Sequence, residues 1–226
     1  MMSDAVYVKK YEEPPFDRKE ILRYMGCKVS DPRAELLIDE CLDEITAGLT
    51  YRVCYREFKV SRTKDGLDLG FTVTGSRDLS KNLEGCRGII LFAATCGIAP
   101  DRLIARYGRL SPAKALCFQA IGAERIESLC DEFNRDISLE AMSKGLYTRP
   151  RFSPGYGDLS LSVQKEIFAV LDCHRKIGLS LNDSLLMSPS KSVTAIIGLG
   201  SSPRAASGGD CASCSKQDCG FRKDKP

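Results

Sequence analysis

The sequence predicts an α+β domain with a central, largely antiparallel sheet flanked by helices. Two apolar runs of strand length, at residues 88–95 and 192–199, are separated by long segments with helical periodicity. Between residues 51 and 74, two β-like runs flank a Lys-Asp-Gly turn, which is typical of a hairpin. Helices therefore lie between hairpins, and this mixed order favours an antiparallel sheet.

The first elements expected along the chain are two helices. The first covers Asp17 to Met25 and stops at Gly26. The second begins with Asp31 as its N-cap and Pro32 at its first position, and it ends at Gly48. It carries one apolar stripe at four-residue steps, formed by Leu37, Cys41 and Ile45.

The predicted hairpin has strands at residues 51–60 and 67–74. Alternation in its second strand predicts four residues that point into the core: Leu67, Leu69, Phe71 and Val73. The further elements are a helical turn at 78–84, a central strand at 88–95, a short helix from Pro100, a long helix from Pro112 to Ser143, a loop at 149–158, a helix at 160–176, and strands at 184–187 and 192–199.

Composition narrows the class of protein. The chain has 226 residues, of which 43% are hydrophobic and 28% charged, and its net charge is +3. These values are ordinary for a soluble globular protein, and we expect neither a nucleic-acid partner nor a membrane. The first residues lack the apolar core of a signal peptide, so we expect a cytoplasmic protein with reduced thiols.

We expect three segments along the chain. Residues 1–75 form N-terminal helices and a hairpin that belong to the same domain as a core at residues 76–200. Residues 201–226 form a linker and a tail. The linker is rich in Gly, Ser and Ala, so we expect it to be flexible.

The loop at Arg151 to Tyr156 is the most informative part of the sequence. Pro154 and Gly155 predict a tight turn that lets a ligand approach bare backbone. Arg151 offers a planar fork suited to a carboxylate, and Tyr156 can lay its ring on a flat heterocycle. Taken alone, the same residues also fit a plain turn with a surface arginine.

The residues from Arg151 to Leu199 resemble the activation domain of cobalamin-dependent methionine synthase. The family pattern is Arg-x-Ala/Ser-Pro-Gly-Tyr, a helix, Gly-x-x-Leu, Ser-x-x-Met and a Ser-Val strand. Its counterparts here are Arg151 to Tyr156, Gly178 to Leu181, Ser184 to Met187, and Ser192-Val193. A looser resemblance extends back to Ser76, and the residues before it resemble only free-standing, short members of the family.

The resemblance implies a C-shaped domain that binds S-adenosylmethionine on the Pro-Gly loop. It implies that Arg151 holds the methionine carboxylate and that the loop from Ser153 to Tyr156, with Pro154 and Gly155, contacts the ligand. It also implies a glutamate on the preceding long helix, best matched by Glu127. The family's tyrosine-bearing segment beyond the Ser-Val strand has no counterpart here, and its N-terminal acidic ligand contact aligns with no single residue.

Glu127 has two interpretations from sequence alone. It shares a helix face with small residues that leave room for a ligand: Ala120, Ala123 and Cys130. A carboxylate there can receive an ammonium group. The alternative is an ordinary solvated charge, because Glu124, Asp131 and Glu132 lie nearby and are equally acidic.

The tail carries Cys211, Cys214 and Cys219 in a C-x-x-C-x-x-x-x-C pattern. A C-x-x-C pair can place two thiolates on one metal, so the tail is a candidate zinc or iron–sulfur site. A fourth ligand would come from another cysteine, an aspartate, water or a partner. The alternative is a redox-reactive tail without metal.

Two functions follow from these patterns. In the first, the chain is an accessory S-adenosylmethionine-binding module. It supports reductive methylation of the cobalamin of a methionine synthase that lacks its own activation domain, with flavodoxin or ferredoxin as electron donor. The partner supplies cobalamin, because no Asp-x-His-x-x-Gly motif is present.

In the second function, the chain is a metal- or iron–sulfur-carrying redox activator or chaperone of another corrinoid methyltransferase. The tail favours the second function, and the Arg151 to Tyr156 loop favours the first.

Overall fold

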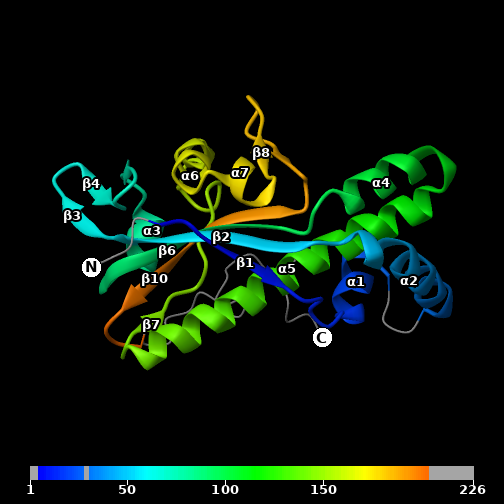
Figure 1. Ribbon diagram of the computed structural model, residues 1–226, viewed down its shortest axis with the longest axis horizontal. Coiled ribbons are helices and arrows are strands. Elements are labelled where there is room, and N and C mark those ends of the chain that lie inside the picture. The colour runs from blue at the N-terminus through cyan, green and yellow to red at the C-terminus, as the bar shows by residue number, and fades with distance from the viewer. Residues whose placement is uncertain (1–4, 28–30, 204–226) are drawn as a thin grey trace.

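A five-stranded antiparallel sheet forms the centre of the computed structural model, which describes residues 5–27 and 31–203 (Figure 1). Its strands, in spatial order, are β1 (Tyr7–Tyr11), β2 (Tyr51–Lys59), β6 (Cys86–Thr95), β10 (Ser192–Gly200) and β7 (Tyr147–Thr148). The predicted strands at 88–95 and 192–199 are confirmed as β6 and β10, which pair with each other along their length. The antiparallel α+β class is therefore confirmed.

Helix α5 (Pro112–Ser143) covers one face of the sheet. Its 32 residues correspond to a length of about 48 Å at the standard helical rise. Its apolar side, which includes Ile126, Leu129 and Phe133, packs against Val53 of β2 and Phe92 of β6. Both ends of this helix agree with the sequence prediction: Ser111 caps it, Pro112 opens it, and its last residue is Ser143.

The opposite face of the sheet is covered by η2 (Leu161–Val163), α6 (Gln164–Leu171) and α7 (Cys173–Ile177). The sequence predicted a single helix here, and that prediction is wrong. Asp172 adopts a left-handed conformation with φ of 49° and separates α6 from α7. Aspartate tolerates this conformation better than most residues, and its carboxylate accepts a bond from Arg175 Nε at 2.6 Å.

The predicted hairpin at 51–74 is also corrected. Strand β2 joins the central sheet, whereas β3 (Ser61–Thr63), β4 (Gly66–Asp68) and β5 (Val73–Thr74) form a small separate sheet. Leu67 and Leu69 are buried as predicted, but Val73 is 52% exposed. A turn closed by the bond from Leu69 N–H to the Thr72 carbonyl, with Gly70 at φ of 79°, breaks the alternation between them.

The expected strand at 184–187 is instead mostly a turn. It connects β8 (Ser180–Leu181) to β9 (Met187–Ser188), which form a two-stranded sheet. Leu185 lies at φ of 61°, and the Asn182 side chain accepts the Leu186 N–H at 2.9 Å. Asparagine side chains favour such turns because they bond to backbone groups a few residues on.

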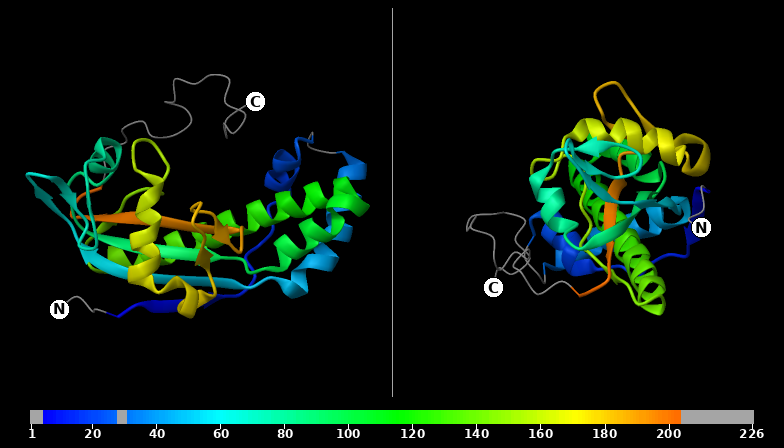
Figure 2. Two further views of the ribbon diagram at one scale, coloured as in Figure 1. Left: turned by 90° about the horizontal axis from the view of Figure 1, so that it is seen from above. Right: turned by 90° about the vertical axis from the view of Figure 1, so that its left-hand side faces the viewer.

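Another group of helices packs around the N-terminal half of α5. They are α1 (Arg18–Met25), α2 (Pro32–Ile45) followed by η1 (Thr46–Gly48), and α4 (Ala99–Leu110). The predicted N-cap at Asp31 is confirmed, and Asp17, expected as the first residue of its helix, is the N-cap of α1. Seen from above, α3 (Arg77–Asn82) and the small sheet project at one end and α1 and α2 at the other, which gives a C-shaped outline (Figure 2). No helix among the described residues is both long and apolar enough to cross a bilayer.

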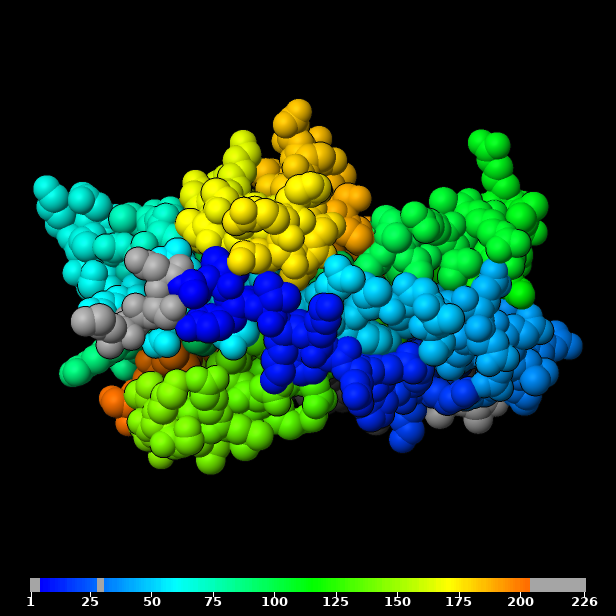
Figure 3. Space-filling model, in the orientation of Figure 1, coloured from blue at the N-terminus to red at the C-terminus, as the bar shows by residue number. Residues whose placement is uncertain are grey.

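A buried ion pair holds the N-terminal segment to α5. The side chains of Glu124 and Arg125 are 1% and 0% exposed, and Arg125 Nε lies 2.6 Å from Glu124 Oε2. Arg125 also donates to the carbonyl oxygens of Pro14 and Pro15 and stacks on the Phe16 ring, 3.8 Å from its centroid. In the space-filling view the N-terminal segment, in dark blue, crosses the molecule between α5 and the α6–α7 layer (Figure 3).

Burial lowers the pKa of the Arg125 guanidinium, but the hydrogen bond and the charge of Glu124 outweigh it and raise the pKa above its ordinary value. The guanidinium therefore stays charged in the interior. Glu124 in turn accepts the Asp17 N–H at 3.1 Å and the Ser128 hydroxyl at 2.6 Å. The pair thus satisfies backbone groups at the start of α1 and fixes where that helix begins.

Replacing the buried cation should strongly destabilise the fold. We expect Arg125→Met to lower the free energy of unfolding by about 3–5 kcal/mol, because it leaves the Glu124 carboxylate buried without a counter-charge. Urea unfolding measures the effect. Arg135→Met is the matched control, since the Arg135–Glu132 pair is exposed and should contribute less than about 1 kcal/mol. Equal losses in the two variants would contradict a structural role for the pair.

Candidate functional site

The loop singled out by the sequence leaves β7 and runs back along β10. The Arg149 N–H donates to the Gly198 carbonyl at 2.8 Å, and Phe152 exchanges two hydrogen bonds of 2.9 Å with Ile196. Beyond Phe152 the chain turns. The Tyr156 N–H donates to the Ser153 carbonyl at 3.1 Å, and Gly155 sits at φ of 85°. The predicted turn at Pro154 and Gly155 is therefore present, and its backbone is accessible because Gly155 is exposed.

Arg151 points from this loop towards α5. Its Nη2 lies 2.7 Å from Glu127 Oε2 and its Nη1 lies 2.8 Å from Asp131 Oδ1. Burial lowers the pKa of the Arg151 guanidinium, but the nearby acidic groups, among them Glu127 and Asp131, raise it above the ordinary value. The structure thus brings together Arg151 and Glu127, which the sequence had proposed separately for one site.

An acidic cleft lies beside this arginine, between α1 and α5. Its volume is about 200 Å³. Its lining comprises Asp17, Glu20 and Tyr24 from the start and body of α1, and Glu124, Glu127, Ser128 and Asp131 from α5. Burial and the charge of Glu127 raise the pKa of Tyr24. Several of these acids are already paired, Glu20 with Arg23, Glu124 with Arg125, and Glu127 and Asp131 with Arg151. The five carboxylates still outnumber these three arginines, and the excess negative charge favours a cation.

Four acidic residues of the cleft are not among the site residues predicted from the sequence: Asp17, Glu20, Glu124 and Asp131. Asp17 and Glu20 lie within the first predicted helix, and Glu124 and Asp131 are expected from the sequence only as charged neighbours of Glu127. The i,i+4 spacing of Glu127 and Asp131 places both on one helix face, which was a usable signal. The contribution of α1 was not visible locally, because it depends on where that helix crosses α5.

Two expectations about the surroundings of Glu127 are wrong. Glu124 is not a solvated charge equivalent to Glu127, because its side chain is 1% exposed and paired with Arg125. The small residues at positions 120 and 130 do not make room in the cleft either. Ala120 and Cys130 are buried in apolar clusters. The Glu127 side chain itself is 47% exposed, as an acceptor at the cleft mouth must be.

The other predicted residues lie on or beyond the loop. Pro154 is buried, Ser153 is half-buried, and Tyr156 is 69% exposed with its ring edge-on to Phe152 at 5.5 Å. Cys211, Cys214 and Cys219 lie outside the described residues. Within residues 5–27 and 31–203, no group of three or more His, Cys, Asp or Glu side chains is arranged to hold a metal.

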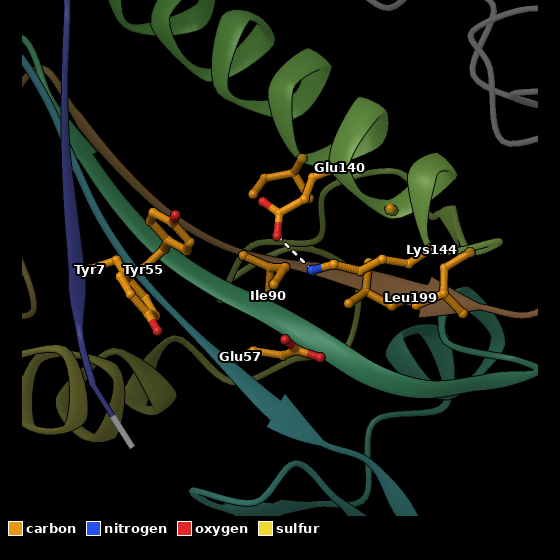
Figure 4. A pocket seen from close by; sticks show the side chains of 10 residues that line it. Tyr7, Tyr55, Glu57, Ile90, Glu140, Lys144 and Leu199 are labelled. Carbon is orange, nitrogen blue, oxygen red and sulfur yellow. Dashed lines mark hydrogen bonds and ion pairs between the residues drawn. The ribbon is translucent and has the colours of Figure 1, made fainter. Parts of the chain in front are cut away.

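A second cavity of about 390 Å³ lies under the C-terminal end of α5, against β1, β2, β6 and β10 (Figure 4). Its floor is apolar and includes Ile90 and Leu199. The rings of Tyr7 and Tyr55 stack at 5.5 Å on one side, and an ion pair of 2.6 Å between Lys144 and Glu140 lies on the other. None of the site residues predicted from the sequence lines this second cavity, so the acidic cleft remains the candidate site.

Comparison with known proteins places this geometry in context. A family model described as vitamin B12 dependent methionine synthase, activation domain, matches residues 89–209. A search of the curated proteins found no match. Among solved structures, the crystal structure of the MetH reactivation domain bound to AdoHcy aligns with a TM-score of 0.64 and 17% identity. The alignment covers 89% of this chain and 79% of that chain, and at this identity it establishes a shared fold.

Proposed function

Because the chain belongs to the activation-domain family of vitamin B12-dependent methionine synthases, we propose that it binds S-adenosylmethionine and supports the reductive methylation of a protein-bound cobalamin. Residues 76–200 are the binding core in this proposal, and residues 1–75 complete the same domain by supplying α1. Residues 201–226 form a linker and a tail.

The observation that carries the proposal is the position of Arg151 between two carboxylates at the mouth of an acidic cleft. S-adenosylmethionine presents a carboxylate, an ammonium group and a sulfonium, so it is a zwitterion with one additional positive charge. The Arg151 guanidinium can exchange its hydrogen bonds to Glu127 and Asp131 for a bidentate pair with the ligand carboxylate. The two released carboxylates then receive the ammonium group. The remaining acids of the cleft favour the net positive charge of the ligand.

The Pro-Gly loop provides the second half of the proposed site. Gly155 exposes its backbone at the turn, and Tyr156 presents a ring that is 69% exposed and free to stack on adenine. Pro154 and Ser153 shape the turn beneath them. This arrangement holds the ligand between a charged end at Arg151 and a flat aromatic surface at Tyr156.

The role of these residues is orientation. Reduced cobalamin, when presented by a partner protein, supplies the nucleophile that accepts the sulfonium methyl group. Arg151, Glu127 and the loop hold the ligand so that this methyl group faces outward at a fixed position, which lowers the entropic cost of the transfer. We propose a methionine synthase without its own activation domain as the partner, and flavodoxin or ferredoxin as the electron donor.

The cysteine tail supports the second candidate function. If Cys211, Cys214 and Cys219 bind zinc or an iron–sulfur cluster, the chain acts as a redox activator or chaperone of another corrinoid methyltransferase. The observation that favours it is the C-x-x-C spacing, which the activation role does not require.

Removal of the arginine should abolish most of the binding. We expect calorimetry to detect S-adenosylmethionine binding to the wild-type chain and Arg151→Ala to weaken it by about 2–4 kcal/mol, because a partly desolvated charge pair is lost. Arg135→Ala, an exposed arginine on α5, is the control. Methylthioadenosine, which lacks the amino-acid end, should bind wild type and Arg151→Ala alike. Equal affinity of both proteins for S-adenosylmethionine would refute the assignment of Arg151.

Neutralising Glu127 should weaken binding by about tenfold, the size of one charge-assisted hydrogen bond. Glu127→Gln keeps the shape of the side chain and removes the charge that receives the ammonium group. Glu132→Gln on the same helix is the control, since Glu132 pairs with Arg135 rather than lining the cleft. Titration calorimetry on both variants checks this. Similar affinities would indicate that Glu127 is only a surface charge.

The two candidate functions differ in what the tail must do. With a corrinoid protein and a low-potential reductant, we expect the full chain to promote methylation of the corrinoid by S-adenosylmethionine. A chain truncated after Pro203 should retain the affinity for S-adenosylmethionine, because no residue of the cleft or loop is lost. Anaerobic purification with metal analysis tests the tail itself. Metal in the full chain, together with corrinoid activation that does not need S-adenosylmethionine, would favour the second function.

A further inference from the structure

We propose that Asp158 is a positioning residue that clamps the ligand-binding loop, residues 151–157, to the first turn of α3. This inference rests on the proposed function, because it assumes that the loop receives S-adenosylmethionine. Asp158 itself is not expected to touch the ligand. It fixes the downstream end of the segment that carries Gly155 and Tyr156.

The first observation is the set of hydrogen bonds that Asp158 accepts. Its Oδ1 accepts the Ser76 hydroxyl and the Asp78 N–H, the latter at 3.2 Å, and its Oδ2 accepts the Arg77 N–H at 2.8 Å. Both carboxylate oxygens are therefore used, and all three donors belong to the start of α3. The Ser76 bond and the Arg77 N–H hold the pKa of Asp158 below its usual range, so the carboxylate is ionised at neutral pH.

The second observation is the close approach of Gly157 to the same turn. A Cβ at this position would lie 2.5 Å from Asp78 Oδ2, and Gly157 has φ of 54°. The positive φ favours glycine, and a larger residue would also have to displace the Asp78 carboxylate. The contact is independent of the Asp158 carboxylate, and it shows that the loop is seated directly on α3.

The third observation is how the loop is held elsewhere. Upstream, the bonds of Phe152 with Ile196 attach it to β10. At the tip, the Tyr156 N–H donates to Ser153 inside the loop. Downstream, the Gly155 N–H donates to the Leu159 carbonyl and the Leu159 N–H donates to the Tyr156 carbonyl, and Leu159 is buried next to Asp158. The exposed tip is thus a short arch between β10 on one side and the segment of Asp158 and buried Leu159 on the other, and Asp158 attaches that segment to α3. Losing one fixed point lets the arch sample conformations that cannot bind the ligand.

Hydrogen exchange on the free protein and calorimetry with S-adenosylmethionine test the clamp together. In Asp158→Ala we expect the amides of residues 153–159 to exchange at least about tenfold faster and affinity to fall about tenfold, while β6 and α5 stay protected. Asp158→Asn retains an acceptor and should be intermediate in both measurements. Gly157→Ala should loosen the loop without removing a charge. Asp65→Ala, in the exposed turn between β3 and β4, is the charge-matched control and should resemble wild type.

The two measurements separate the possible failures. If wild type binds S-adenosylmethionine and Asp158→Ala exchanges at the wild-type rate, there is no clamp. If the loop of Asp158→Ala exchanges faster but affinity is unchanged, Asp158 is structural only and the positioning role is wrong. If wild type does not bind at all, the proposed function fails, and the exchange of the free loop alone decides whether the clamp exists.

Discussion

The buried ion pair of Glu124 and Arg125 is the constraint on which the rest of the site depends. Burying two charges is costly unless each is fully bonded, and here each one is. Arg125 donates to two backbone carbonyls of the N-terminal segment that crosses α5. Glu124 accepts the backbone N–H of Asp17, the N-cap of α1. Together they determine the point at which the N-terminal segment passes α5. Helix α1 starts from that point and forms one wall of the acidic cleft.

The cleft gathers negative charge that the protein only partly neutralises. Arg151 offsets two carboxylates, Glu127 and Asp131. On α1, Arg23 pairs with Glu20, whereas Asp17 adds a further carboxylate to the cleft. Like charges at short range repel, and a bound cation relieves that repulsion. On the proposed function, this excess of negative charge beside Arg151 favours ligands that carry both positive charge and one carboxylate.

Elements with strong local signals could be predicted from the sequence. The Ser-Pro start of α5, the Asp-Pro start of α2 and the apolar runs of β6 and β10 all correspond to elements of the structure, because each signal acts on its own backbone. The single helix at 160–176 and the buried Val73 failed where one residue with positive φ, Asp172 or Gly70, changes the direction of the chain. The approach of Arg151 to Glu127, by contrast, followed from the family resemblance rather than from periodicity. The acids of α1 could not be found in either way, since their place depends on the crossing at Arg125.

Arg125 holds the N-terminal segment mainly through its backbone, and this has a consequence for the residues that the segment can carry. The arginine bonds to main-chain oxygens, which almost any sequence presents, so the segment can diverge while its path is kept. The Phe16 ring adds a side-chain contact by stacking on the guanidinium. Substitutions elsewhere in the segment should therefore leave the anchor in place, and with it the wall of the acidic cleft that α1 provides.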